Sequence, residues 1–412
     1  MEIFLGNENY FVEGSKNAAI YDLSNERIYE LNEKAKESII HYANKEKLDK
    51  KERVFIEDLI SKKIIEPKKI SKEFVFKKPV YKINFAWLEL TSSCNLRCIH
   101  CYGDFGCKKE QKEKTLSNEE WFDIIDQLHE CGCRSIQLIG GEPLYNLNYH
   151  DILEYLNKKE FKRITIFTNA TLINENNIKE LKKYDVNIRF SLYGYEAKSH
   201  EKITGIKGSF DKTINAINLL KENNVNVNVA IVLMKENEKY IEKIKDYVIN
   251  KLHIDYNGFD VIRPSCVNDN IEHRIESYDL LSKRYYTFPK FKITKTQYIK
   301  NHFFNSCWCS KVAITSDGDV LPCIFSRDFV IGNIKKNSLK ELHGEILKKW
   351  SITKNKIEEC KECEYKYACS DCRPLAIGIN GGVFSKYPRC CYSPREGVWE
   401  NIRHITKEIN SK

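Results

Sequence analysis

Residues 91–104, TSSCNLRCIHCYGD, place three cysteines within a short stretch: Cys94, Cys98 and Cys101 have the spacing C-x3-C-x2-C. A structural zinc ion takes four protein ligands, and so does an ordinary four-iron cluster held by thiolates. Three cysteines therefore leave one coordination position open. The spacing is compatible with three buried thiols, with part of a zinc site completed elsewhere in the chain, or with a four-iron cluster whose fourth iron binds a small molecule.

Length and composition limit the classes of protein to which the chain can belong. Its 412 residues predict two or three domains, and 42% hydrophobic with 30% charged residues is typical of soluble globular proteins. The sequence has no apolar run of about 18 residues that could span a bilayer. The first residues, MEIFLGNENY, have no basic region followed by an apolar one. We therefore expect a cytoplasmic protein with no membrane partner.

The 16 cysteines and the net charge of +9 are informative in that setting. A reducing cytoplasm does not favour a disulfide framework, so regularly spaced cysteines indicate metal or redox chemistry. Lysines alternate with acidic residues, as in KENEKYIEKIKDY at 235–247. This pattern favours solvated helix faces over a groove for nucleic acid.

The first 78 residues differ in pattern from the rest of the chain. Short strand-like segments at 9–14, 18–23 and 27–31 precede helix-like segments at 32–44 and 50–63 and the basic connector EPKKISKEFVFKKP at 66–79. This order predicts a small α+β module of winged-helix size.

From residue 83 onwards, apolar β-type segments alternate with amphipathic helical ones, which predicts an α/β fold with parallel strands and right-handed crossovers. The expected strands are 83–90, 135–141, 163–169, 186–194, 225–233 and 258–264. The expected helices begin at 117 and lie near 148–158, 175–183, 209–223 and 237–251, and Ser117 with Glu120 has the pattern of a capping box.

Two motifs follow directly on the first two strands. The cysteine loop comes after INFAWLEL, and GGEP, Gly140 to Pro143, comes after SIQLI. Function gathers at the carboxyl ends of parallel strands, so both motifs are expected at one rim of the sheet. On its own, GGEP is also a common turn.

These paired motifs resemble the radical S-adenosylmethionine enzymes over residues 83–290. The resemblance implies a partial (β/α)6 TIM-like barrel in which Cys94, Cys98 and Cys101 hold a [4Fe-4S] cluster and the open iron binds S-adenosylmethionine. It also implies that the backbone of Gly140, Gly141 and Glu142 meets the methionine amino group and that Asn169 and Ser191 contact the ribose and carboxylate. Each of these polar residues could equally be a strand-end turn or cap.

Two further positions are weighed against the family pattern. His100 stands where the family often has an aromatic residue near the adenine, and packing is favoured over ligation there. Thr204 stands near the position at which many relatives carry a carboxylate-binding arginine. The residue that binds the carboxylate therefore stays unassigned.

The C-terminal third contains a second set of cysteines. Cys307, Gly318 and Cys323 give C-x10-G-x4-C, and the segment 360–372 gives C-x2-C-x5-C-x2-C before a later Cys390. Zinc ribbons usually separate their cysteine pairs by about 15–20 residues, more than the five found here. The pattern resembles the SPASM extension, which implies two auxiliary clusters over residues 300–412. The implied outer ligands are Cys360, Cys363, Cys369 and Cys390, and the implied inner ligands are Cys307, Cys323 and Cys372.

The inner set has three clear ligands, so Cys309 could be the fourth or the site could be open to substrate. The remaining cysteines, Cys107, Cys131, Cys133, Cys266 and Cys391, are expected to be buried or incidental. The resemblance thus implies three [4Fe-4S] clusters in all.

The N-terminal module resembles the element with which enzymes that modify ribosomal peptides bind a leader peptide by strand addition. The C-terminal phrases, including KYPRCCYSP, resemble maturases that form thioethers in Cys-rich precursors. We expect such an enzyme, with the precursor and an electron donor such as ferredoxin or flavodoxin as partners. The alternatives are a sulfatase-maturing or other peptide-oxidising enzyme, a zinc-binding regulator and an RNA-modifying radical enzyme.

Overall fold

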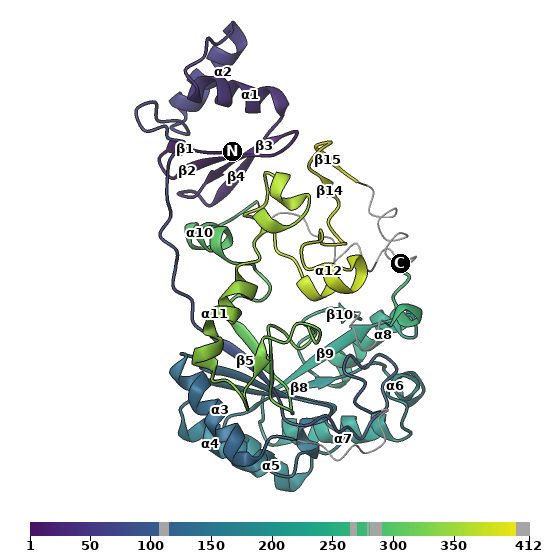
Figure 1. Cartoon of the computed structure of the whole chain (residues 1–412). Helices are drawn as coiled ribbons and strands as arrows, with labels where there is room; N and C mark the ends of the chain where they lie inside the picture. The colour runs from purple at the N-terminus through teal and green to yellow at the C-terminus, as the bar shows by residue number, and fades with distance from the viewer. Residues whose placement is uncertain (107–114, 264–269, 278–279, 281–290, 401–412) are drawn as a thin grey trace. The chain divides into compact units, whose positions relative to one another are not determined.

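The computed structural model describes residues 1–106, 115–263, 270–277, 280 and 291–400 (Figure 1). The chain divides into two compact units, one of residues 81–277 and 310–349 and the other of residues 1–80, 278–309 and 350–412. Both units are assembled from segments far apart in the sequence, whereas the domains expected from the sequence, 1–78, 83–290 and 300–412, are continuous. Those functional boundaries remain a prediction.

The unit of residues 81–277 and 310–349 is built on a parallel sheet. Six strands run in sequence order across it, as the alternating pattern predicts. They are β5 (Phe85–Glu89), β6 (Ser135–Ile139), β7 (Arg163–Thr168), β8 (Asn187–Ser191), β9 (Val227–Leu233) and β10 (Phe259–Val261). The α/β prediction is confirmed, and all six carboxyl ends lie at one rim.

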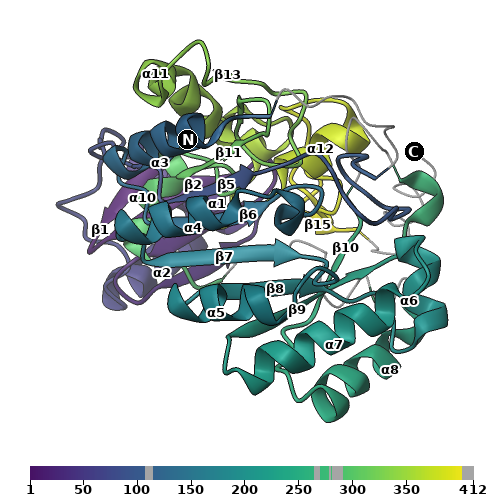
Figure 2. The same ribbon diagram turned by 90° about the horizontal axis from the view of Figure 1, so that it is seen from below.

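Helices connect these strands and lie along one side of them (Figures 1 and 2). They are α3 (Asn118–Glu130), α4 (Tyr149–Lys158), α5 (Glu175–Lys183), α6 (Ala197–Thr204), α7 (Ser209–Glu222) and α8 (Ile241–Asp246). Short turns are η1 (Pro143–Tyr145), η2 (Glu238–Tyr240), the π-helical η3 (Tyr247–Lys251) and η4 (Ile271–His273). Ser117 and Glu120 form the expected capping box. The sequence analysis missed α6, and the helix expected at 237–251 is broken into three parts.

The sheet continues beyond β5 with strands from the C-terminal third of the chain. Strand β11 (Lys311–Ile314) pairs parallel with β5, and β12 (Asp319–Leu321) and β13 (Gly332–Asn333) follow antiparallel, before α11 (Leu339–Trp350). These strands were not expected from the sequence. They cover the free edge of β5 and bury Val312 and Ile314, which explains why a segment so far along the chain is recruited.

The other unit begins with a four-stranded antiparallel sheet in the order β1-β2-β3-β4. Its strands are β1 (Glu2–Gly6), β2 (Asn9–Glu13), β3 (Ala18–Asp22) and β4 (Arg27–Leu31), followed by α1 (Glu33–Ala43) and α2 (Lys50–Ser61). The sequence predicted the last three strands and both helices but missed β1. One face of the sheet packs on the helices through Ile3, Leu5, Phe11, Ile20, Ile39, Ile56 and Leu59.

The opposite face of this sheet packs on the cysteine-rich part of the chain. Its apolar core joins side chains of β2, β3 and β4 to α10 (Lys295–Phe303) and to the segment that carries Cys363. The remaining elements are short: η5 (Lys354–Lys356), η6 (Cys360–Glu362), α12 (Arg373–Asn380), β14 (Tyr392–Ser393) and β15 (Val398–Trp399). The N-terminal sheet is therefore buried on both faces.

No helix in the part of the chain that the structure describes is both long enough and apolar enough to span a bilayer.

Candidate functional site

The cysteine loop after β5 lies against the turn that follows β6. The backbone N–H of Gly141 donates to Thr91 O at 2.9 Å, and that of Glu142 donates to Ser93 O at 2.9 Å. These bonds extend the β5–β6 pairing beyond the strands. The two sequence motifs are therefore neighbours, as their positions at strand ends predicted.

Both glycines of the GGEP turn are required by this close approach. A Cβ on Gly140 would lie 2.5 Å from Thr91 O, and one on Gly141 would lie 2.2 Å from Ser93 O. Gly140 also has a φ of +155°, which side chains rarely adopt. The contact of this backbone with a methionine amino group remains a prediction.

The side chain of Glu142 ties the end of β6 to the end of β7. Its fully buried carboxylate accepts hydrogen bonds from Thr168 Oγ1 at 2.6 Å, from Asn169 N at 2.8 Å and from Leu144 N at 3.1 Å. Burial raises the pKa of Glu142 to about 7, and these donors oppose the rise. The carboxylate thus has a structural role that the sequence did not reveal.

The three cysteines of the loop are each partly buried. The backbone N–H of Leu96 donates to Cys94 Sγ at 3.4 Å, and that of Phe105 donates to Cys101 Sγ at 3.4 Å. Burial raises the pKa of the Cys94 thiol to about 12. A bound cation such as iron would stabilise the thiolate and so allow the thiol to ionise near neutral pH. Backbone donors aimed at sulfur suit thiolates, and the residues fit the cluster that the family resemblance implies.

Asn169 and Ser191 lie at neighbouring strand ends, where they were expected. Asn169 Nδ2 donates to Asn95 Oδ1 of the cysteine loop at 2.8 Å, and Asn169 also hydrogen-bonds Cys94. Ser191 is buried and hydrogen-bonds the hydroxyl of Tyr193. Their local partners account for both positions, so contacts with a cofactor remain predictions.

Tyr193 is a residue of this site that the sequence analysis missed. Its ring lies 4.7 Å from that of His100 at an interplanar angle of 69°. Burial, together with the charges of the loop cysteines, raises the pKa of its hydroxyl. Burial, together with the charge of His273, lowers the pKa of His100 to about 4, so this imidazole is neutral. The sequence could have indicated Tyr193, because side chains two residues apart in a strand lie on the same face, and Tyr193 follows Ser191 at that spacing.

Thr204, near the position of the arginine found in many relatives, is fully buried, and its hydroxyl lies 2.7 Å from Ser209 Oγ. A different cation lies at the end of β5. Arg327 forms an ion pair with the buried Glu89 and lies 5.5 Å from the ring of Tyr102 and 5.1 Å from that of Phe105. This cluster, also missed, holds the segment after Cys323 against the loop that carries Cys101.

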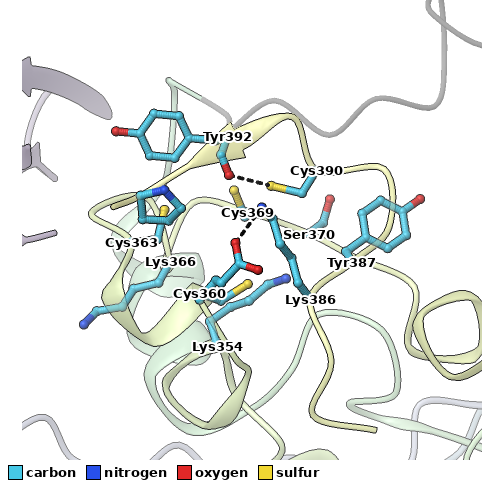
Figure 3. A pocket seen from close by; sticks show the side chains of 12 residues that line it. Lys354, Cys360, Cys363, Lys366, Cys369, Ser370, Lys386, Tyr387, Cys390 and Tyr392 are labelled. Atoms are coloured by element: carbon cyan, nitrogen blue, oxygen red, sulfur yellow. Dashed lines mark hydrogen bonds and ion pairs between the residues drawn. The ribbon is translucent and has the colours of Figure 1, made fainter. Parts of the chain in front are cut away.

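The four cysteines expected to bind the outer auxiliary cluster surround one cavity. Cys360, Cys363, Cys369 and Cys390 line an empty volume of about 400 Å³, and Figure 3 shows their side chains around it. In the described residues, no three Cys, His, Asp or Glu side chains converge as they would on a single ion. A [4Fe-4S] cube instead needs thiolates spread around a cavity, each on a different iron. The set fits such a cluster, and its ligation remains a prediction.

Buried charges lie beside these cysteines. Lys354 Nζ lies 2.5 Å from Asp371 Oδ2, and Arg373 Nη2 lies 2.6 Å from the same oxygen. Burial alone would raise the pKa of Asp371, but the two cations outweigh it and hold the pKa below its usual value. Lys386, which also lines the cavity, pairs with Glu359 at 2.8 Å. Asp371 could have been suspected from the sequence because it lies between Cys369 and Cys372. Lys354 has no cysteine beside it in the sequence that would have indicated its place at this site.

The expected inner set is not brought together within one unit. Cys307 and Cys372 belong to the unit of the N-terminal sheet and Cys323 belongs to the other, so this set remains a prediction. Cys309 is buried. Of the thiols expected to be incidental, Cys133 and Cys391 are buried and Cys131 is partly buried, while Cys107 and Cys266 lie outside the described residues.

Two family models match the chain. The radical SAM superfamily matches residues 88–248, which begin at the end of β5 and contain β6 to β9. The SPASM iron-sulfur cluster-binding domain matches residues 307–364. The two matches cover the first cysteine loop and the beginning of the second set.

Curated relatives include proteins with different named activities. The subtilosin biosynthesis protein AlbA of Bacillus subtilis is 28% identical over 343 residues, which cover 78% of this chain and 73% of AlbA. The AdoMet-dependent heme synthase of Methanosarcina barkeri is 24% identical over 340 residues, covering 75% of this chain and 96% of the synthase. Relatedness at this level does not distinguish their substrates.

Solved structures share the fold. Streptococcus suis SuiB bound to its precursor peptide SuiA has a TM-score of 0.58 at 16% identity, covering 94% of this chain and 98% of SuiB. The structure of anSMEcpe with bound AdoMet has a TM-score of 0.55 at 19% identity and covers 80% of this chain and 92% of anSMEcpe.

Proposed function

Because this chain is a radical S-adenosylmethionine enzyme with a SPASM domain, we propose that it matures a ribosomally made, Cys-rich peptide by joining cysteine sulfur to carbon in thioether crosslinks. The observation that carries the proposal is the small antiparallel sheet packed on a four-cysteine cavity within one unit. AlbA, a bacteriocin biosynthesis protein, and SuiB, solved with a precursor peptide, support a peptide substrate.

We assign different roles to the two sets of cysteines. Cys94, Cys98 and Cys101 would hold the radical cluster, which when loaded supplies the electron that cleaves S-adenosylmethionine to a 5′-deoxyadenosyl radical. The GGEP backbone, Asn169 and Ser191 would orient the bound cofactor at the strand ends. The cysteines of the SPASM domain would hold two auxiliary clusters, giving three [4Fe-4S] clusters with ferredoxin or flavodoxin as reductant.

The balance of the reaction fits this division. One hydrogen atom leaves the substrate carbon to give 5′-deoxyadenosine and one proton leaves the cysteine thiol. One electron is released as the C–S bond forms, and a cluster held by the SPASM cysteines would supply its acceptor. The peptide therefore becomes two hydrogens lighter and loses one thiol for each crosslink.

The sheet edge formed by β4 is the place where we expect the leader peptide to add a strand. The edge of β1 is occupied, because Phe4 N donates to Ser71 O at 2.8 Å and Ser71 N donates to Phe4 O at 3.0 Å. On β4, Ile28 N donates to Phe291 O at 3.2 Å. Among the described residues, β4 beyond Ile28 has no second strand beside it. A leader strand would therefore lie along Tyr29–Leu31.

The experiment is an anaerobic reaction of the reconstituted enzyme with S-adenosylmethionine, reductant and each short Cys-rich peptide that the neighbouring open reading frames are found to encode. We expect a product two mass units lighter per crosslink, with one fewer thiol that can be alkylated. A lighter product with all thiols retained would exclude thioether formation and favour another peptide oxidation. Turnover of an iron tetrapyrrole without peptide turnover would favour the activity named for the heme synthase relatives. Zinc in place of iron would favour a regulator.

A further inference from the structure

Residues 362–367 include Cys363, precede Cys369 of the outer site, and also form the support of the N-terminal sheet. We propose that the outer four-cysteine site controls peptide recognition: its loaded cluster holds this segment in the shape that supports the sheet, and without the cluster the β4 edge loses its support. The inference rests on the proposed function, because it regulates the edge to which we assign the leader.

The apolar core beneath the sheet includes the cysteines themselves. Side chains of three strands share one cluster with the segment that follows Cys360. Its buried members are Tyr10, Val12, Ala19, Tyr21, Leu23, Ile28, Ile293, Tyr298, Cys363, Tyr365, Tyr367, Ala368 and Tyr392. Cys369 and Cys390 pack against the same core. Three of the four cavity cysteines are therefore part of the contact surface of the sheet.

Hydrogen bonds fix the register between the segment and the sheet. Ser15 N donates to Glu362 O at 2.8 Å, and the buried hydroxyl of Tyr21 donates to Glu364 O at 2.8 Å. A Cβ on Gly14 would lie 2.3 Å from Glu364 Oε2. The β2–β3 hairpin thus lies in close contact with this segment and is hydrogen-bonded to it.

One contact reaches the proposed leader edge directly. The hydroxyl of Tyr365 donates to the carboxylate of Glu30 on β4, and the backbone N–H of Tyr365 donates to Cys363 Sγ at 3.4 Å. One residue therefore contacts both a cavity cysteine and the edge strand. The tyrosine ring also belongs to the core beneath the sheet.

The segment has little regular structure to hold it without ligands. Between η6 and α12 it consists of turns and irregular backbone. Its shape therefore depends on the sheet above and on the cavity beside it. Metal binding at such a site contributes directly to folding, so loss of the cluster is expected to loosen this segment and the strands packed on it.

The test compares full-length protein reconstituted anaerobically as wild type, Cys369→Ala and Cys131→Ala. Cys131 ends α3 in the other unit and serves as a matched control. Hydrogen exchange of residues 9–31 is measured together with iron content. We expect Cys369→Ala to lose about four irons, one cuboidal cluster, and at least about tenfold of amide protection in β3 and β4, while the control and strands β5 to β9 are unchanged.

Leader binding is measured on the same samples by the anisotropy of a fluorescein-labelled synthetic leader of the Cys-rich peptide that the enzyme converts. We expect its affinity to fall at least about tenfold in Cys369→Ala. Tyr365→Phe keeps every cysteine and should retain its iron while binding the leader a few fold more weakly. If Cys369→Ala is insoluble, wild type before and after reconstitution gives the comparison, with Cys94→Ala reporting the effect of losing the radical cluster.

Unchanged protection and affinity after loss of the outer iron would overturn the inference. Reduced protection with unchanged affinity would also overturn it, because the edge would then bind independently of its support. If the wild-type protein binds no leader at all, the proposal that the N-terminal sheet recognises a leader is wrong. The inference that the outer site controls this recognition is then wrong as well. A fall in exchange protection would still identify the outer site as the support of the sheet.

Discussion

The cysteine loop after β5 and the outer cysteine cavity differ in how the chain builds them. The loop offers three cysteines from a single short stretch, and its position is set by backbone bonds to the adjacent GGEP turn. The cavity offers four cysteines drawn from residues 360–390, and three of them pack against the core beneath an N-terminal sheet more than three hundred residues away in sequence. If both sets bind clusters as proposed, the first would leave one coordination position open, whereas the second would supply all four thiolates.

The two regions also differ in charge. Near the loop, the buried groups are mainly amides, hydroxyls, a neutral imidazole and Glu142 held by three donors, with one ion pair between Glu89 and Arg327. Beside the cavity, Lys354 and Arg373 share one buried carboxylate of Asp371, and Lys386 pairs with Glu359. Cations near a thiolate-bound cluster would offset its negative charge, so these charges fit the cluster that we propose for the outer site.

The largest expected effect follows from the open position of the loop. Replacing Cys94, Cys98 and Cys101 by Ala should abolish formation of 5′-deoxyadenosine, because the cluster that cleaves the cofactor has lost every ligand. Iron should fall by about a third from about 12 per chain, which corresponds to three cuboidal clusters. Chromatography of the products and iron analysis measure both. Cleavage that persists in the triple variant would exclude this loop as the radical site.

A large effect on stability is expected at the outer cavity. Asp371→Asn leaves Lys354 and Arg373 buried without their anion, and breaking a buried ion pair costs about 3–5 kcal/mol. Thermal unfolding of the reconstituted protein should therefore begin at a lower temperature. The exposed pair Lys348–Glu345 offers the control, since Glu345→Gln should have no measurable effect. Equal behaviour of the two variants would show that the buried pair is not required.

At the loop, the sharper test is the pH dependence of Glu142. Its pKa is about 7 in the folded protein and near 4.5 when unfolded, so the folded state keeps a proton that the unfolded state releases. Stability should therefore fall by about 3 kcal/mol as pH rises from below 4.5 to above 7. Glu142→Gln should remove this dependence in urea unfolding at pH 5 and pH 8. Parallel profiles for the two proteins would contradict the raised pKa.

The smallest effect is expected at Cys309, which decides whether the inner site resembles the open loop or the closed cavity. If Cys309 is not a ligand, Cys309→Ala should keep its full iron content and still give a peptide two hydrogens lighter. Iron analysis and mass spectrometry check this. Loss of about four irons would instead identify a closed inner site, whose role would then be electron transfer.

The same contrast explains how much the sequence could predict. Six strands, most helices, the Ser117 cap and the neighbouring positions of the cysteine loop and GGEP follow from local patterns, and the structure agrees with them. Strand β11, the Glu89–Arg327 pair and the environment of Lys354 depend on contacts between distant segments. No local period encodes such contacts. The GGEP glycines were expected to face a ligand. In the structure they are required because the backbone of the cysteine loop lies too close to leave room for a Cβ.

The shared core beneath the N-terminal sheet has a consequence for synthesis of the protein. The four strands of the sheet are complete once residue 31 has been made. The face of the sheet that carries Tyr10 and Tyr21 is covered by residues around Tyr365 and Tyr367. At about 5–20 residues per second, a ribosome needs some tens of seconds to reach them. During that interval the nascent chain presents an unpartnered aromatic surface near its own N-terminus. Chaperones that bind exposed apolar segments should therefore associate with this chain early and release it only when its last sixty residues emerge.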